Sequence, residues 1–234
     1  MSFRRALIVG AGAGLSAALA RRFTREGLGV DLAARRIDTL AALCAETGAR
    51  ASVCDAADAA QVAALFARLD AGGAPDIVVY NASFRARGPL VELDPAEVQR
   101  SLHISAFGAF LVAQQAARRM LARRLPGPHH GAIMLTGATA GVKGFALSAP
   151  FAMGKFALRG LAQSLARELA PQGIHVAHVV IDGGIRAAHR PDPPDAPDST
   201  LDPDAIAATY WHVLTQHRSA WSWEVEVRPW VERF

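Results

Sequence analysis

Short apolar runs alternate with longer stretches of helical periodicity along most of this chain, and this alternation constrains its fold more than any other feature. A short, continuous apolar run is typical of a strand buried on both faces, whereas apolar residues three and four positions apart indicate a helix. Because parallel strands need crossover connections, the alternation predicts an α/β fold with a doubly wound parallel sheet flanked by helices. The apolar runs that predict strands are 6–9, 30–33, 51–53, 76–80, 133–136 and 174–181.

The stretches between these runs predict helices, and one more helix and one more strand follow them. The helices between the runs are expected at 15–25, 38–46, 58–69, 95–124 and 150–169. Nearer the C-terminus, Asp202 and Pro203 are typical of a helix start, and the alternating residues 220–227 indicate a last strand. Because 51% of the 234 residues are hydrophobic, a single domain over 1–234 can bury a large core.

Residues 186–202 differ in composition from the rest of the chain, because "RAAHRPDPPDAPDST" is rich in Pro and Asp. Such a segment buries too little apolar surface to offset the conformational entropy lost on ordering. We therefore predict a mobile loop here, on the substrate side of the fold.

The turn after the first predicted strand is rich in glycine. Gly10, Gly12 and Gly14 lie between that strand and Leu15, where the first helix is expected to begin. Glycines at this place let the backbone turn sharply and approach a pyrophosphate, while amide N–H groups and the helix dipole favour the anion. A plain tight turn is the alternative, and the flanking strand and helix favour a dinucleotide-binding turn.

The second predicted strand is followed by two basic residues, Arg35 and Arg36. A carboxylate at this place would hold a free ribose 2′-hydroxyl, whereas a guanidinium can bind a 2′-phosphate through two hydrogen bonds. The pair therefore favours NADP(H) over NAD(H) as the cofactor. Solvated surface charge is the alternative for both arginines.

Several motifs together resemble the short-chain dehydrogenase/reductase family over residues 5–186. Gly10 and Gly14 match the family's glycine turn, with Ser16 in place of a third glycine. Asp55 in "VCDAAD" matches the family's adenine-contacting Asp, and Asn81 with Ala82 matches its Asn-Ala-Gly element. The resemblance implies a Rossmann-like fold and a dinucleotide-binding role for these residues. It also implies a homodimer or homotetramer that associates through the helices at 95–124 and 150–169.

The same resemblance places only one of the family's four catalytic residues in this chain. Lys155 stands at the family's lysine position, and Phe151 stands where the family has its tyrosine. Ala138 takes the place of the serine, and Ser105 takes the place of the helix asparagine. These positions identify an atypical branch of the family. In addition, Gly183 follows Asp182 where the family has a Pro-Gly turn beside the nicotinamide.

A phenylalanine cannot donate a proton, so carbonyl reduction needs another acid. Thr139, Ser105, Ser148 and His103 are the candidates, and a water molecule polarised by Lys155 is a further one. We expect Lys155 to hold the ribose of the cofactor, because only two of the 25 basic residues are lysines and a compact ammonium suits that contact.

Net charge and cysteine content indicate which partners, metals and cellular compartment to expect. The formal net charge of +4 is spread along the chain without aromatic residues interleaved in a basic run, which argues against a nucleic-acid surface. The two cysteines have no metal-ligand spacing and are typical of a reducing compartment. No apolar run is long enough to span a membrane. We expect a cytoplasmic protein with no metal site.

Two functional hypotheses follow. The first is an NADP(H)-dependent oxidoreductase that acts on a small carbonyl or alcohol through a degenerate catalytic tetrad. The alternative is a catalytically silent dinucleotide-binding sensor or interaction protein, which is consistent with the loss of three catalytic positions.

Overall fold

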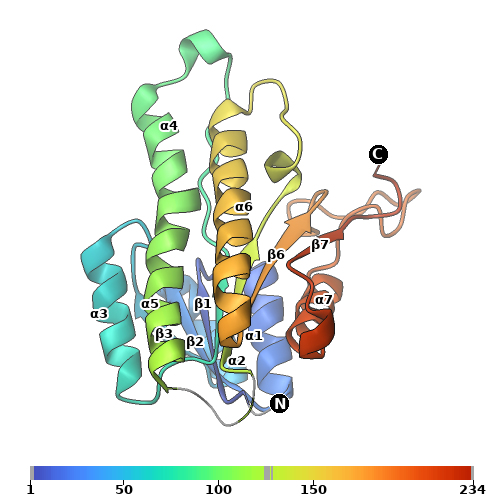
Figure 1. Cartoon of the computed structure of the whole chain (residues 1–234). Coiled ribbons are helices and arrows are strands. Elements are labelled where there is room, and N and C mark those ends of the chain that lie inside the picture. The colour runs from blue at the N-terminus through green and yellow to red at the C-terminus, as the bar shows by residue number, and fades with distance from the viewer. Residues whose placement is uncertain (1–2, 124–126, 128, 233–234) are drawn as a thin grey trace.

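The chain folds around one parallel β-sheet, shown in the computed structural model of Figure 1, which describes residues 3–123, 127 and 129–232. The strands occur in the order β3-β2-β1-β4-β5-β6-β7, and every neighbouring pair is parallel. The doubly wound α/β fold predicted from the sequence is confirmed. The strands are β1 (Arg5–Val9), β2 (Gly29–Ala34), β3 (Arg50–Val53), β4 (Ile77–Tyr80), β5 (Gly131–Thr136), β6 (Ile174–Ile181) and β7 (Glu224–Val227).

Helices cover both faces of the sheet. One buried cluster joins α1 and α7 to one face, and a second joins α3, α5 and α6 to the other. The helices are α1 (Leu15–Arg25), α2 (Ala41–Thr47), α3 (Ala59–Asp70), α4 (Pro95–Leu102), α5 (Gly108–Arg123), α6 (Ala149–Leu169) and α7 (Pro203–Leu214). None of these described helices is both long and apolar enough to cross a membrane.

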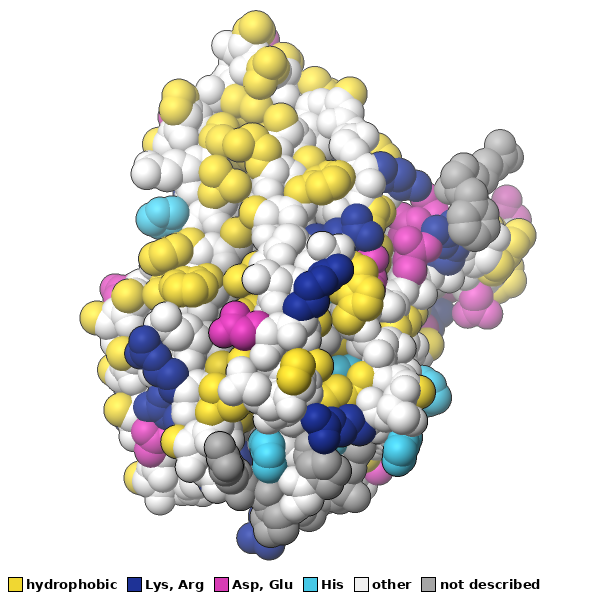
Figure 2. All heavy atoms as spheres, viewed as in Figure 1, with side chains coloured by type: hydrophobic (Ala, Val, Ile, Leu, Met, Phe, Trp, Pro, Cys, Tyr) yellow, Lys and Arg dark blue, Asp and Glu magenta, His cyan; other side chains and the backbone are white. Residues whose placement is uncertain are grey.

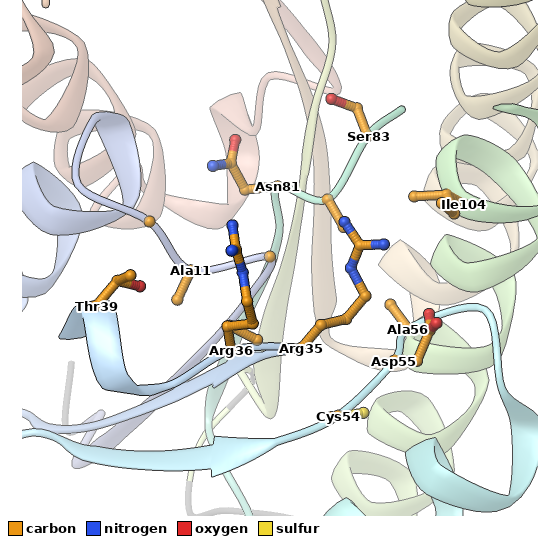
Figure 3. Close-up of a pocket in the computed structure, with 14 residues that line it drawn as sticks. Ala11, Arg35, Arg36, Thr39, Cys54, Asp55, Ala56, Asn81, Ser83 and Ile104 are labelled. Atoms are coloured by element: carbon orange, nitrogen blue, oxygen red, sulfur yellow. The ribbon is translucent and has the colours of Figure 1, made fainter. Parts of the chain in front are cut away.

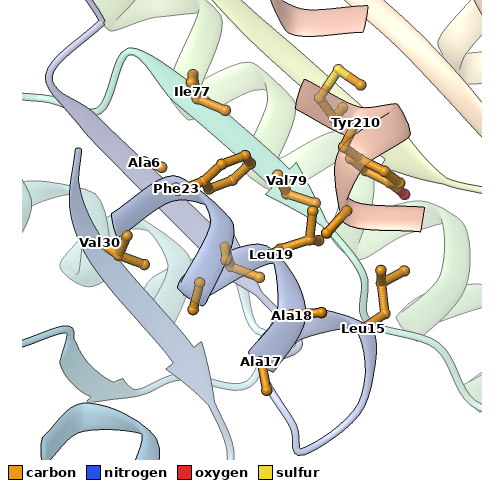
Figure 4. Packing of buried hydrophobic residues seen from close by; sticks show 14 of the residues in the cluster. Ala6, Leu15, Ala17, Ala18, Leu19, Phe23, Val30, Ile77, Val79 and Tyr210 are labelled. Atoms are coloured by element: carbon orange, nitrogen blue, oxygen red, sulfur yellow. The ribbon is translucent and has the colours of Figure 1, made fainter. Parts of the chain in front are cut away.

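The strands carry apolar side chains on both faces, as expected for a parallel sheet covered by helices on both sides. Along β1, Ala6 and Ile8 belong to the first cluster, whereas Leu7 and Val9 belong to the second. Figure 4 shows the first cluster, in which Phe23 of α1 and Tyr210 of α7 pack over the sheet with full burial of both rings.

The strand register brings the carboxyl ends of the central strands to one edge. Val9 of β1 pairs with Ala33 of β2 and with Tyr80 of β4, and Tyr80 in turn pairs with Leu135 of β5. The strand order reverses between β1 and β4, and ligands of open α/β sheets bind in the crevice at such a point. The residues that follow these strands are therefore neighbours in space.

The helix predicted at 95–124 is interrupted. A π-helical turn, His103–Phe107, separates α4 from α5, and Arg124 lies outside the described residues. The buried Tyr80 hydroxyl donates a hydrogen bond to the carbonyl oxygen of Ile104 in this turn. A strand residue thus satisfies a helix carbonyl, which helical periodicity alone does not reveal. The helix predicted at 38–46 likewise begins as a 3₁₀ turn before α2.

The segment predicted to be a mobile loop folds back on itself beyond β6. Ile185 and Leu201 form a parallel bridge, and the Arg186 guanidinium pairs with the carboxylates of Asp192, Asp198 and Asp202. Asp192 also accepts hydrogen bonds from the Thr200 hydroxyl and from the backbone amides of Thr200 and Asp198. The Thr200 hydroxyl above all, with these amides and Arg186, lowers the pKa of Asp192 to about 2. Motion of this segment over a substrate stays a prediction.

Candidate active site

The glycine turn leaves β1 with a conformation that suits glycine. Gly10 has φ +84°, and the amides of Gly10 and Ala11 both donate to the Ala33 carbonyl of β2. A Cβ atom at Gly10 would lie 2.4 Å from the Ala82 nitrogen, so this turn packs directly on the end of β4. A Cβ atom at Gly12 would meet no atom within 4 Å, because Gly12 faces open space.

That open space is a cavity of about 350 Å³ at the carboxyl edge of the sheet. Figure 3 shows Arg35 and Arg36 extending into it from the end of β2, beside Asn81. Both guanidinium side chains are exposed, and neither forms an ion pair with any described residue. Asp55, after β3, also lines the cavity. The cavity is therefore lined by two basic side chains and one acidic side chain.

The predicted dinucleotide-binding residues are largely brought together. Gly10, Gly12, Arg35, Arg36, Asp55, Asn81 and Ala82 all line this cavity. Gly14 and Leu15 do not line it, since Gly14 is the N-cap residue of α1 and Leu15 is buried in the core.

A short hydrogen-bond chain connects two of the loops. The Asn81 amide donates to the Ser16 hydroxyl over 2.8 Å, and that hydroxyl donates to the Gly10 carbonyl over 3.1 Å. Ser16, which stands where the family has a third glycine, therefore links the glycine turn to the residue that follows β4. This contact was not predictable from the sequence, because nothing in the spacing of residues 10, 16 and 81 indicates it.

A second cavity, of about 520 Å³, continues from the first, and Asn81 and Ser83 line both. It contains most of the positions singled out as catalytic. Ala138, Thr139, Phe151 and Lys155 line it, together with Gly183 and Ser148. The two cavities together form one cleft along the carboxyl ends of β1, β4, β5 and β6.

Lys155 is the buried cation of this cleft. Its ammonium donates to the Thr136 carbonyl over 2.8 Å, and the residue is only 3% exposed. Burial lowers the pKa of Lys155 to about 8, because an ammonium is poorly solvated in such surroundings. The Thr136 hydroxyl is hydrogen-bonded to the Tyr210 hydroxyl at 2.8 Å, so α7 helps to hold the strand end that receives Lys155.

The Phe151 ring lies beside two cationic side chains, at the position where a tyrosine would offer a phenol proton. The Arg85 guanidinium lies 5.0 Å from the ring centroid, and the Lys155 ammonium lies 5.7 Å from it. Aromatic faces attract cations at such distances. The Arg85 guanidinium and the Lys155 ammonium therefore lie near the same aromatic ring.

The candidate acids are in different situations. The Thr139 hydroxyl lies 3.5 Å from the Ile181 carbonyl, and the buried Ser148 hydroxyl has no hydrogen-bond partner among the described residues. Ser105 lines neither cavity, because it packs against Gly154 of α6. His103 is exposed on the π-helical turn and also lines neither cavity.

Close packing and ion pairs hold the turn after β6. Gly183 has φ +145°, and a Cβ atom there would lie 2.8 Å from Pro229. Asp182 is buried, with its carboxylate 3.3 Å from the Arg228 guanidinium and 4.0 Å from the Lys143 ammonium. The aspartate that departs from the family's Pro-Gly turn thus anchors this turn to the end of β7.

Three arginines of the second cavity were missed in the sequence analysis. Arg85 and Arg87 follow β4, and Arg190 belongs to the segment after β6. The nearness of "FRAR" to the carboxyl end of β4 was an available signal for the first two. Among the described residues, no group of three or more His, Cys, Asp or Glu side chains could hold a metal ion.

Known proteins that are similar to this chain share its fold. Residues 4–191 match the profile described as short chain dehydrogenase. The Escherichia coli (strain K12) cyclic-di-GMP-binding biofilm dispersal mediator protein is 34% identical over 181 residues, which is 76% of this chain and 72% of that protein. The sorbitol dehydrogenase of Cereibacter sphaeroides is 33% identical over 186 residues, covering 77% of this chain and 71% of the enzyme. A metagenomic short-chain oxidoreductase crystallised with NADP superposes with a TM-score of 0.82 at 29% identity, covering 98% of each chain.

Proposed function

Since the chain belongs to the short-chain dehydrogenase family, we propose that it is an NADP(H)-dependent oxidoreductase acting on a small carbonyl or alcohol. One observation carries this proposal. The buried ammonium of Lys155 lines the cavity that continues from the one lined by the glycine turn and the two arginines. This arrangement offers a dinucleotide and a second small molecule adjoining places.

The first cavity fits a phosphorylated dinucleotide. The open space at Gly12 leaves room for a pyrophosphate near the start of α1, and the first amide groups of a helix attract anions. Arg35 and Arg36 suit a 2′-phosphate, and Asp55, Asn81 and Ala82 line the remaining wall. When bound, the nicotinamide supplies or accepts the hydride that interconverts a carbonyl and an alcohol. The NADP bound to the metagenomic neighbour supports the same cofactor class here.

We assign the proton to Lys155. A lysine with a pKa of about 8 can donate a proton to a developing alkoxide and recover it from solvent near neutral pH. One of its N–H groups is engaged with the Thr136 carbonyl, which leaves the others for the ribose and the substrate oxygen. Reduction then adds one hydride and one proton to the carbonyl, and the cofactor is oxidised.

A second candidate function is a dinucleotide-binding sensor without turnover. The phenylalanine at 151 favours it, because the phenol of the usual mechanism is missing from the cleft. The name of the E. coli relative, which describes a cyclic-di-GMP-binding mediator, also supports a ligand-sensing role.

A titration of the purified protein with NADPH and NADH, followed by nicotinamide fluorescence, tests the proposal. The same samples are then given aldehydes, ketones and enones. NADPH binding with turnover of any of them supports the oxidoreductase, whereas binding without turnover supports the sensor. The double variant Phe151→Tyr with Ala138→Ser separates the two further. It is expected to gain weak ketone reduction in a silent protein and to lose native turnover in an enzyme built around another acid.

Removal of the guanidinium groups in the first cavity is expected to change cofactor preference. The variant Arg35→Ala with Arg36→Ala should weaken NADPH binding by at least about 10- to 100-fold, because the loss of even one charge-assisted hydrogen bond costs roughly 1.5–3 kcal/mol. NADH binding should change by less than about twofold, since it has no 2′-phosphate. Both dissociation constants come from the fluorescence titration, and an equal loss for the two cofactors would contradict the assignment.

We also propose a homodimer through the outer face of α5 and α6. Exposed apolar side chains cluster there, namely Phe107, Phe110, Met153 and Phe156. Figure 2 shows hydrophobic side chains gathered over this face, and an exposed patch of this kind marks a contact surface. The variant Phe156→Glu should shift the protein to monomer in light scattering after size-exclusion chromatography. A wild-type monomer would refute the interface.

A further inference from the structure

The second cavity has cations on its walls and no carboxylate among the described residues that line it. Three arginines, Arg85, Arg87 and Arg190, share it with the Lys155 ammonium. Elsewhere in the chain, Arg159 and Arg186 pair with acidic side chains. None of the three cavity arginines forms an ion pair within the part of the chain that the structure describes. Like charges in one cleft repel, and they create a strong positive potential there.

The segment that carries two of these arginines is held by hydrogen bonds on either side of them. The Ser101 hydroxyl lies 3.0 Å from both the Phe84 carbonyl and the Pro150 carbonyl, which joins the segment before Arg85 to the start of α6. One residue after Arg87, the Gly88 amide donates to the Leu147 carbonyl over 3.1 Å. The arginine-bearing segment is thereby fixed against the residues that precede Phe151.

The third arginine belongs to the segment after β6. Ala187 and Arg190 exchange backbone hydrogen bonds of 3.1 and 2.8 Å, which fixes a tight turn. The Arg190 side chain runs along Gly184, where an added Cβ atom would lie 3.1 Å from its Cδ atom. The three arginines therefore line the cavity from two separate segments, one after β4 and one after β6.

Apolar side chains complete the cavity. Phe145, Phe151 and Ile185 line it beside the arginines, and the Arg85 guanidinium stacks over the Phe151 ring. Such a cavity suits a molecule with an uncharged body and a negative group, because guanidinium groups bind carboxylates and phosphates through paired hydrogen bonds.

We propose that the substrate is an anionic carbonyl compound or alcohol, whose carboxylate or phosphate is bound by Arg85, Arg87 and Arg190. This inference rests on the proposed function for the identity of the second cavity as the substrate cavity. The cofactor's own phosphates are assigned to the glycine turn and to Arg35 and Arg36, so the two sets of arginines serve different anions.

Matched pairs of ligands test the inference without requiring turnover. Levulinate is compared with methyl levulinate, and dihydroxyacetone phosphate with dihydroxyacetone, by calorimetric titration into the wild-type protein with and without NADP⁺. Each anion is expected to bind at least ~10-fold more tightly than its neutral counterpart if its charge is recognised. Preference for one anion over the other identifies the group as carboxylate or phosphate. Equal binding within both pairs would overturn the inference.

Variants assign the effect to the arginines. Arg87→Ala and Arg190→Ala should each weaken binding of the anion by about 10-fold and leave the neutral counterpart unchanged. Arg167→Ala, at the far end of α6, removes the same charge from an exposed place outside both cavities and should change neither. A loss of NADPH affinity in Arg87→Ala, with anion binding intact, would show that the arginine serves the cofactor and would overturn the inference.

The result that would refute the proposed oxidoreductase function differs from the result that would overturn anion binding. A wild-type protein that binds neither NADPH nor NADH would refute the oxidoreductase, whereas the comparison of anion with neutral ligand on the protein alone would still decide the inference.

Discussion

Replacing Lys155 with methionine is expected to lower kcat for carbonyl reduction by about 10²- to 10⁴-fold, the usual contribution of a positioned general acid. The methionine approximates the length of the lysine stem, and it removes a buried charge that burial disfavours. The Thr136 carbonyl loses its donor at the same time, so the stability changes oppose each other. The melting temperature, followed by circular dichroism, should therefore move little, and the loss of rate can be assigned to the missing proton donor.

The pH dependence of kcat also tests Lys155 as the proton donor, because reduction and oxidation should respond to pH in opposite directions. Reduction requires protonated Lys155, whose pKa is about 8, so kcat should be flat below about pH 7 and fall as pH rises through 8. Oxidation of the corresponding alcohol requires the neutral amine and should rise through the same range. Rates under saturating NADPH, together with NADPH affinity at each pH, separate proton donation from cofactor binding.

Lys155→Arg is the matched control, because a guanidinium keeps its charge at any relevant pH. This variant should retain much of the cofactor affinity while losing turnover and the change near pH 8. Reduction that proceeds at the wild-type rate in Lys155→Arg would exclude Lys155 as the acid and return attention to Thr139 and Ser148.

Replacing Gly10 with alanine is expected to destabilise the protein by about 2–6 kcal/mol and to abolish NADPH binding. The left-handed conformation costs a non-glycine residue about 1–3 kcal/mol, and a Cβ atom 2.4 Å from the Ala82 nitrogen requires the backbone to shift. Overpacking of this kind adds roughly 1–3 kcal/mol. Urea unfolding measures the first effect and fluorescence titration measures the second.

Two other glycines separate the causes. Gly12→Ala introduces a Cβ atom that meets nothing within 4 Å, so stability should be unchanged while NADPH binding weakens because the atom enters the first cavity. Gly160→Ala, on α6, also meets nothing, and it should stabilise the helix by about 0.5–1 kcal/mol without affecting NADPH. Wild-type stability in Gly10→Ala would contradict the packing of this turn on β4.

The sequence was sufficient for the order of strands and helices because both faces of the sheet are buried, which leaves continuous apolar runs such as Ile77–Tyr80. It was also sufficient for the glycine turn, since Gly10 needs its conformation locally. It did not reveal the π-helical turn, because the partner of the Ile104 carbonyl is Tyr80, a residue of a distant strand. Local periodicity carries no record of such a contact.

The candidate site was predictable only where a motif marked it. Lys155 and Arg35 stood at recognisable places in the chain, and the structure puts them in adjoining cavities. Arg190 lies in a segment whose Pro and Asp content predicted only mobility, and its direction depends on a turn closed by Ala187. Ser105 stood at a recognisable place too, yet packing against Gly154 keeps it away from the cavity.

The contacts that hold residues 185–202 determine which part of this segment can move. Leu201 is buried and bridges Ile185, while Asp202 both caps α7 and pairs with Arg186. Lifting the whole segment would uncap a helix and expose a core leucine, so we expect any motion to be confined to residues 187–199. If these residues open as a short flap on a fixed base, Arg190 moves with them. We then expect opening to carry one of the cations out of the cleft and to release a bound anion in the same motion.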